Sequence, residues 1–251
     1  MNNLILNTFV KKCEADFIHF MGIESMPSYQ LIPKDMSLEL AKKQGFDSPA
    51  ATFYDIPTGA HKLKIWSLVP QLRADYLVFH EFTHILDAET YSKRDKNKHM
   101  SNRGYTEYHA AQIDFIKLLG AESISQPFSF SMSKTFETFG GTKTAADFVK
   151  TPHAHATELI NRHDFPANIE TLATTFGLIF NYYGRRSICQ MYSIDYLENV
   201  DNSTIADLIL KETVEALDKY MLGWFDSIHV ATIDQLYQRM AISLAQQYHL
   251  A

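Results

Sequence analysis

The chain has 251 residues, of which 46% are hydrophobic and 21% charged, and its net charge is −6. This is the composition of an ordinary globular protein, and it excludes a predominantly disordered chain. The negative charge argues against wholesale nucleic-acid binding, and no run of about 18 apolar residues predicts a membrane span.

Two features of the sequence predict a reducing compartment. The first 20 residues lack the long apolar run of a signal peptide, because charged residues interrupt it from position 11 onwards. The chain has two cysteines, Cys13 and Cys189, which are too few for a disulfide framework. We therefore expect a cytoplasmic protein in which both thiols are buried.

The first predicted elements are a helix and a β-hairpin. Apolar residues at helical spacing predict a helix over residues 4–20. Strand-forming residues at 52–54 and 63–68, joined by a turn with proline and glycine, predict a hairpin within a strand-rich region over 28–69. A short helix is expected over 37–43.

Two longer helices are predicted next. Proline is tolerated in the first turn of a helix, so Pro70 is expected to open a helix that runs to residue 91. The basic segment 92–103 is interpreted as a solvated loop, with nucleic-acid contact as the weaker alternative. A second helix is expected over 105–119, ended by Gly120.

The remainder is predicted to be a long loop followed by helices. Residues 121–142 should form the loop, as a flap over a site. Helices are expected over 145–162, 167–192, 203–221 and 231–248. The predicted fold class is α+β and mainly helical, with a small antiparallel sheet in a domain over 1–120, on which an all-helical region over 121–251 packs.

The sequence His80-Glu81-Phe82-Thr83-His84 has the features of a zinc site. Histidines four residues apart project from one face of a helix, so both imidazoles can bind one zinc ion. Glu81 follows the first ligand and can accept a proton as general base. A pair of core histidines with Glu81 at the surface is the alternative. It is the weaker one, because residues 77–86 carry no charge other than Glu81, and such an apolar helix has little reason to hold these three residues.

A third ligand is expected from the returning helix. Glu107 follows His84 by 23 residues, and the connecting loop is long enough to bring the chain back. Ala110 and Ala111 lie on the same side of that helix and allow close approach. His109 is an alternative ligand, although it points to another side, and a plain helix-start carboxylate is the third interpretation of Glu107. One zinc ion per chain is predicted.

This motif, followed by Glu107-x-x-Ala-Ala, resembles the zincin metallopeptidases with a glutamate ligand, and most closely the ImmA/IrrE-type proteins. The resemblance implies a zincin-like core of a small sheet, a motif helix and a glutamate-bearing helix over about residues 50–120. It implies His80, His84 and Glu107 as zinc ligands, Glu81 as general base, and peptide-bond hydrolysis. The metzincin branch is disfavoured, because its pattern has glycine where this chain has Asp87. The thermolysin-like branch is disfavoured, because it usually has aspartate where this chain has Ala111.

Further residues are candidates for support of the site. Asp87 lies one turn after His84 and is either a hydrogen-bond partner of a ligand histidine or, as we favour, a solvated surface residue. Hydrogen bonding to a ligand or to the reaction's oxyanion is possible for Tyr105, Tyr108, His109, His153, His155 and His163. The last three histidines are a weaker candidate for a second metal site. Residues 62–69 are a candidate edge strand for binding an extended substrate.

The leading functional hypothesis is a zinc metallopeptidase that acts on a peptide or protein substrate. The alternative is a regulatory protein that keeps the metal site, binds a protein partner and is not a general protease. The third is a helical structural domain without a metal. No membrane and no nucleic acid are predicted as partners, and the sequence specifies no oligomeric state.

Overall fold

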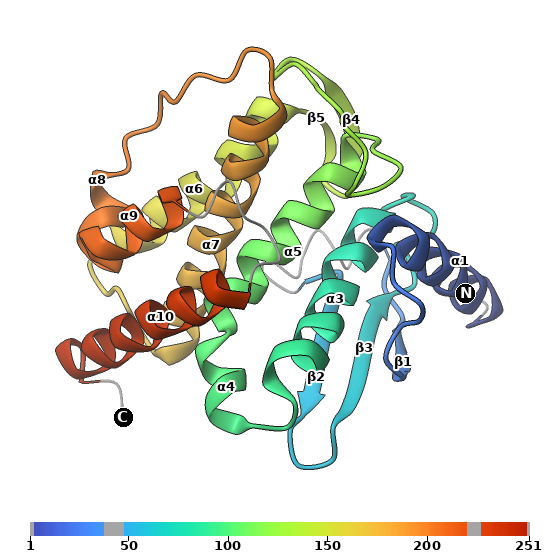
Figure 1. Ribbon diagram of the computed structural model, residues 1–251, viewed down its shortest axis with the longest axis horizontal. Helices are drawn as coiled ribbons and strands as arrows, with labels where there is room; N and C mark the ends of the chain where they lie inside the picture. The colour runs from blue at the N-terminus through green and yellow to red at the C-terminus, as the bar shows by residue number, and fades with distance from the viewer. Residues whose placement is uncertain (1–2, 38–47, 220–226, 250–251) are drawn as a thin grey trace. The chain divides into compact units, whose positions relative to one another are not determined.

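The computed structural model describes residues 3–37, 48–219 and 227–249 (Figure 1). Helices dominate and the sheets are small, so the predicted mainly helical α+β class is confirmed. The chain packs as two compact units that are interleaved along the sequence. Unit 1 comprises residues 1–96, 113–127 and 136–142, and unit 2 comprises 97–112, 128–135 and 143–251. The domain boundary expected at residue 120 stays a prediction.

Unit 1 contains a three-stranded mixed sheet. Its strands are β1 (Tyr29–Lys34), β2 (Ala50–Asp55) and β3 (Ala60–Trp66), in the order β1-β3-β2. The predicted hairpin is confirmed by the antiparallel pair β2–β3, whereas β1 runs parallel to β3. Because β3 is the central strand, the expectation that residues 62–69 form an exposed edge is wrong. In the described part of the chain, β2 is the edge strand that contacts the motif helix.

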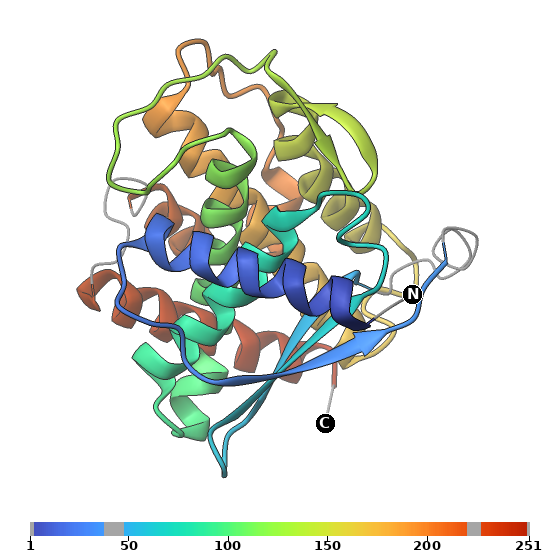
Figure 2. The same ribbon diagram turned by 90° about the vertical axis from the view of Figure 1, so that its right-hand side faces the viewer.

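Two helices cover one face of this sheet (Figure 2). They are α1 (Asn3–Met21), which confirms the first predicted helix, and α3 (Asp75–Asp87), which carries the motif. The rings of Phe17 and Phe20 pack edge-on against Phe79, with centroids 5.3 and 5.4 Å apart, and Phe17 also contacts Phe82. Burying each of these side chains stabilises the fold by about 2–3 kcal/mol. The aromatic cluster therefore fixes α3 in unit 1.

The motif helix begins later than predicted. Residues 67–73 form turns, in which the carbonyl of Leu68 accepts hydrogen bonds from the N–H groups of Gln71 and Leu72. Arg73 has a left-handed backbone, with φ of 48°, which cannot continue a helix. At the other end, α3 passes into a short π-helix, η1 (Ala88–Ser92). The motif lies well inside the regular part of α3.

The chain then forms two helices where a loop and a helix were expected. The segment 92–103 is not a continuous loop, because it contains the short helix α4 (Lys96–Ser101). The second predicted helix is confirmed as α5 (Arg103–Leu118). α5 is one continuous helix whose first ten residues belong to unit 2 and whose remainder belongs to unit 1. Glu107 and Asp114 therefore lie on the same helix.

The predicted loop over 121–142 is wrong in its last third. Strands β4 (Thr135–Thr138) and β5 (Gly141–Thr144) form a two-stranded sheet. The Thr138 hydroxyl donates to the Gly141 carbonyl at 2.7 Å, and Gly141 has a φ of +101° that favours glycine. A tight turn, rather than a long apolar run, therefore specifies this hairpin.

Five further helices belong to unit 2. They are α6 (Ala145–Ile160), α7 (Ile169–Tyr192), α8 (Ser203–Ile209), α9 (Lys211–Lys219) and α10 (Ser227–Gln247). The helix expected over 203–221 is interrupted at Leu210, whose φ is 70°. Its last two residues, and residues 38–43 of the short helix expected at 37–43, lie outside the described ranges. In the ranges described, no helix combines the length and apolar character needed to cross a membrane.

Candidate metal centre

The two motif histidines lie next to each other on α3. Their ring centroids are 4.8 Å apart, and the rings are inclined at 79°. Both side chains are partly exposed, whereas Phe79, Phe82 and Ile85 on the same helix are fully buried. The apolar face of α3 therefore enters the core of unit 1 and leaves both imidazoles accessible at its margin.

A buried carboxylate orients the first histidine. Nδ1 of His80 lies 3.1 Å from Oδ2 of Asp114, whose exposed fraction is 1%. When Nδ1–H donates to a carboxylate, Nε2 carries the lone pair and is available to a metal ion. This arrangement also fixes the direction of the imidazole ring. Asp114 was not predicted from the sequence. The one feature of the sequence that could have indicated it is its position two helical turns after Glu107, which puts both residues on the same face of α5.

The expected third ligand joins the two histidines. The ligand atoms of His80, His84 and Glu107 all lie within 4.8 Å of one another. Ligands around a tetrahedral zinc ion are about 3.4 Å apart, given bonds of about 2.0–2.1 Å, so the upper limit of 4.8 Å is near the spacing that a shared ion requires. Within the described ranges, no other group of His, Cys, Asp or Glu side chains qualifies as a metal site. The group of side chains near enough to share an ion includes Glu107 and not His109.

Unit 2 supports Glu107 from the side of α7. Nδ2 of Asn181 lies 3.5 Å from Oε2 of Glu107, at the long end of hydrogen-bonding distance. Gly177 faces the same carboxyl group, and a Cβ atom added there would be 3.8 Å from Cδ of Glu107. The Glu107 side chain is partly exposed, and the interpretation of it as a plain helix-start carboxylate is not excluded by its burial.

Glu81 is held against the sheet. Its exposed fraction is 8%, and its Oε2 accepts a hydrogen bond of 2.7 Å from the hydroxyl of Thr52 on β2. The same hydroxyl lies 3.3 Å from the main-chain carbonyl oxygen of Glu81. The alternative that placed Glu81 at the surface is therefore wrong. The contact with Thr52, which sequence reasoning missed, restricts the rotation of the carboxylate.

The structure corrects the interpretation of one neighbouring acid. Asp87, at the end of α3, has an exposed fraction of 3%, so the favoured interpretation as a solvated surface residue is wrong. Its position one turn after His84 remains consistent with a hydrogen-bonding role near the ligands. That role stays a prediction.

The other predicted supporting residues do not join the metal group. Tyr105, Tyr108 and His109 have exposed fractions of 5%, 3% and 1%, and this burial argues against direct contact with a substrate. His155 is exposed on α6, and His153 is buried against the ring of Tyr182. His163 is exposed, and the three histidines 153, 155 and 163 form no metal-binding group among the described residues.

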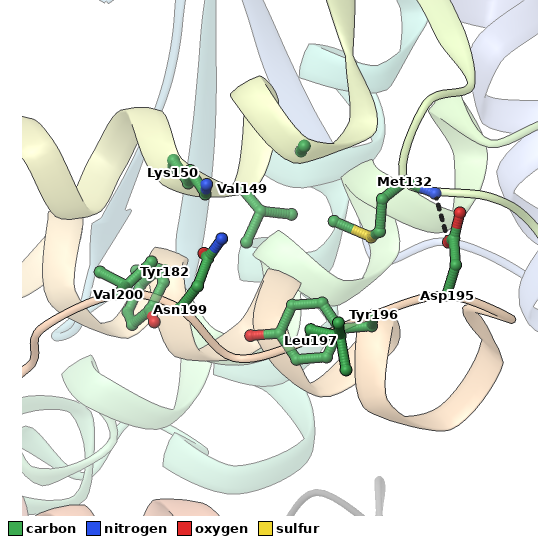
Figure 3. Close-up of a pocket in the computed structure, with 10 residues that line it drawn as sticks. Met132, Val149, Lys150, Tyr182, Asp195, Tyr196, Leu197, Asn199 and Val200 are labelled. Carbon is green, nitrogen blue, oxygen red and sulfur yellow. Dashed lines mark hydrogen bonds between the residues drawn. The ribbon is translucent and has the colours of Figure 1, made fainter.

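A separate hollow of about 220 Å³ lies within unit 2 (Figure 3). Met132 and Val149 point into it from opposite sides, and Leu197 and Val200 add to its apolar wall. None of the motif residues lines this hollow. It is therefore not part of the candidate metal centre.

The segment over 193–202, which borders this hollow, is tied down by two carboxylates. Asp195 accepts a hydrogen bond from the Met132 N–H at 2.8 Å (Figure 3). Glu198 pairs with the Arg186 guanidinium. Burial alone would raise the pKa of Glu198, but the charge and hydrogen bond of Arg186 hold that pKa below its usual value. The ion pair is therefore intact at neutral pH.

Comparison of the chain with protein-family models, with curated proteins and with solved structures found no match. The resemblance of the motif to ImmA/IrrE-type zincins stays a prediction. The functional argument therefore depends on the residues of the site and their geometry.

Proposed function

We propose that this chain is a zinc-dependent metallopeptidase of the zincin type. In this proposal His80, His84 and Glu107 hold the metal ion and Glu81 is the general base. The observation that supports it most strongly is the convergence of the three ligand atoms within 4.8 Å, with Glu81 on the same helix.

The donor set favours zinc. Two imidazoles and one carboxylate suit this ion, and three protein ligands are the usual number in a catalytic zinc site, which keeps a further position for water or substrate. A zinc ion bound there supplies Lewis-acid chemistry, which polarises a carbonyl group and makes water easier to deprotonate. The hydrogen bond from His80 to Asp114 fits this role, because such carboxylates raise the basicity of a ligand histidine.

Glu81 moves the proton in this proposal. Its Oε2 accepts a hydrogen bond from the Thr52 hydroxyl, and in this proposal Oε1 accepts the proton of the attacking water. The water oxygen then forms a bond to the peptide carbonyl carbon. When the C–N bond breaks, Glu81 returns the proton to the leaving amine nitrogen. The carboxylate is therefore regenerated at the end of each turnover.

The outer edge of β2 is suited to align an extended substrate. The N–H of Trp66 donates to the carbonyl of Pro49 at 2.9 Å, so these two residues are a hydrogen-bonded pair. Hydrogen-bonded and non-hydrogen-bonded pairs alternate along the antiparallel strands β2 and β3. The main-chain groups of Thr52 and Tyr54 therefore face away from β3. A peptide paired with this edge would lie beside Glu81, because Thr52 contacts that residue. This hypothesis replaces the edge expected at 62–69.

Removal of the metal tests the proposal. The protein purified without a histidine tag should contain about one zinc ion per chain and should cleave casein or members of a mixed peptide library. A chelator should abolish cleavage, and added zinc should restore it, because the nucleophile depends on the metal. Cleavage that survives complete removal of metal would contradict the proposal. Zinc-loaded protein that cleaves no peptide would favour the regulatory alternative.

A further inference from the structure

The hollow of about 220 Å³ in unit 2 is large enough for a small molecule. An apolar cavity of about 150 Å³ can hold benzene, so this hollow has room for a ring or chain of about six to eight carbon atoms. It is smaller than the sites of drug-sized ligands, which measure about 300–1,000 Å³. The occupant that fits it is therefore a compact molecule rather than a nucleotide or a folded peptide.

The walls of the hollow come from segments of unit 2 that are far apart in the sequence (Figure 3). α6 contributes Ala146, Val149 and Lys150, which are three and four residues apart and so share one face of the helix. Met132 enters from the chain that precedes β4, and the segment over 193–202 forms the opposite side. Tertiary packing therefore determines the shape of the hollow.

Apolar groups form most of the surface of the hollow. Met132 and Val149 face each other across it, and Leu197, Val200 and the ring of Tyr196 add further apolar surface. Leu197 is 81% exposed although its side chain is apolar. A ligand in the hollow would cover part of this surface, and removal of apolar surface from water is favourable. The middle of the hollow therefore suits a hydrocarbon group.

One end of the hollow offers hydrogen-bond donors. In Figure 3 the Asn199 amide points from the segment over 193–202 toward α6, where Val149 and Lys150 lie. Among the residues that the structure describes, Lys150 has no ion-pair partner and the Asn199 side chain has no hydrogen-bond partner. The long stem of a lysine can lie along apolar surface while its ammonium stays at the rim. An ammonium and an amide NH₂ are therefore available there.

The acidic residue of the lining lies at the other end. Asp195 is beyond Met132 and far from Lys150 in Figure 3. Its carboxylate accepts hydrogen bonds from the Ser131 hydroxyl at 2.6 Å and from the Met132 N–H at 2.8 Å, so it is fixed to the chain that precedes β4. Lys150 and Asp195 are the charged residues of the lining in the described part of the chain. The end at Lys150 is therefore positive.

We propose that this hollow binds a small carboxylate with an apolar body, of the size of an arylacetate or a short fatty acid. The hydrocarbon part lies between Met132 and Val149, and the carboxylate accepts hydrogen bonds from Lys150 and Asn199. A carboxylate is the complementary group, because hydrogen bonds from an ammonium are strongest to an anionic oxygen. This ligand site is independent of the proposed metal centre and of the peptidase function.

Titration of the full chain with phenylacetate and with hexanoate, followed by NMR, tests this inference. Phenylacetamide and hexanamide are the neutral counterparts. Each acid should bind at one site per chain with a dissociation constant of about 1 mM or less. Each amide should bind about fivefold more weakly, because it loses the ion pair with an exposed lysine.

Two variants assign the binding to the hollow. Lys150→Gln should reduce the affinity for the acids to that for the amides, whereas Lys211→Gln, which changes an exposed lysine elsewhere in unit 2, should leave both affinities unchanged. Ala146→Met places a larger side chain in the hollow and should weaken binding of acids and amides about tenfold or more. Position 146 is partly exposed on α6, and circular dichroism would verify that the variant is folded.

Three results of the titration would overturn the inference. They are the absence of saturable binding, equal affinity for acids and amides, and wild-type affinity in a folded Ala146→Met variant. A fourth contrary result would come from gel filtration. If the wild-type protein is a dimer that Ala146→Met dissociates, the hollow receives a side chain of a second copy rather than a carboxylate.

Discussion

Replacement of Glu81 by glutamine should lower kcat for peptide hydrolysis by about 10²- to 10⁴-fold while zinc stays bound. Glutamine has nearly the same shape, and its side-chain oxygen can still accept the hydrogen bond from Thr52. It has no carboxylate to take the proton of the attacking water. The expected result is therefore a loss of chemistry without a loss of metal, measured as kcat together with zinc content by mass spectrometry.

The control for this variant is Glu122→Gln, which makes the same change at an exposed position of unit 1. It should retain wild-type kcat and zinc content. If Glu81→Gln hydrolyses the same peptide at the wild-type rate, Glu81 is not the base. If it loses zinc as well as activity, its effect is structural and the assigned role is unsupported.

Replacement of Asp114 by asparagine should weaken zinc binding by about 10- to 100-fold. The change keeps the size of the side chain but removes the negative charge that lies 3.1 Å from Nδ1 of His80. A neutral amide orients the imidazole less strongly and leaves Nε2 less basic. Competition against a chromophoric chelator would measure the zinc dissociation constant.

Asp35→Asn is a matched control for this measurement, because Asp35 is exposed and outside the metal group. Both variants should show a wild-type far-UV circular dichroism spectrum, so that a folding defect can be recognised. An Asp114→Asn protein that is folded and binds zinc as tightly as the wild type would show that the His80–Asp114 contact does not tune the site.

The elements with strong local signals were predictable from the sequence. Helical spacing of apolar residues located α1, the helix expected to open at Pro70 contains α3, and the turn after β2 located the β2–β3 hairpin. The errors occur where single backbone conformations decide the outcome. Left-handed Arg73 delays the start of α3, and left-handed Leu210 divides one expected helix into α8 and α9. Residues other than glycine rarely adopt that conformation, so propensities did not indicate either break.

The order of strands could not be read from local patterns. β1 pairs in parallel with β3, and this pairing makes β3 central and β2 an edge. Alternation of apolar residues indicates that a segment is a strand, but not which neighbour it pairs with. The expected substrate edge was therefore assigned to the wrong strand of the correct hairpin.

The candidate site was predictable to the extent that it follows helix periodicity. The spacing of His80 and His84 fixed one face of α3, and the small residues after Glu107 indicated a helix able to approach closely. The supporting residues depend on tertiary packing instead. Thr52 comes from a strand, and Asn181, which lies beside Glu107, comes from α7, far along the chain from the motif. No spacing rule connects such residues with the motif.

Crystals of the zinc-loaded protein, measured on both sides of the zinc absorption edge, would test the central claim most directly. The account predicts one anomalous peak per chain, bonded to His80 through Nε2, to His84 and to a carboxylate oxygen of Glu107. A protein that binds no zinc, or a peak held by other side chains, would contradict it.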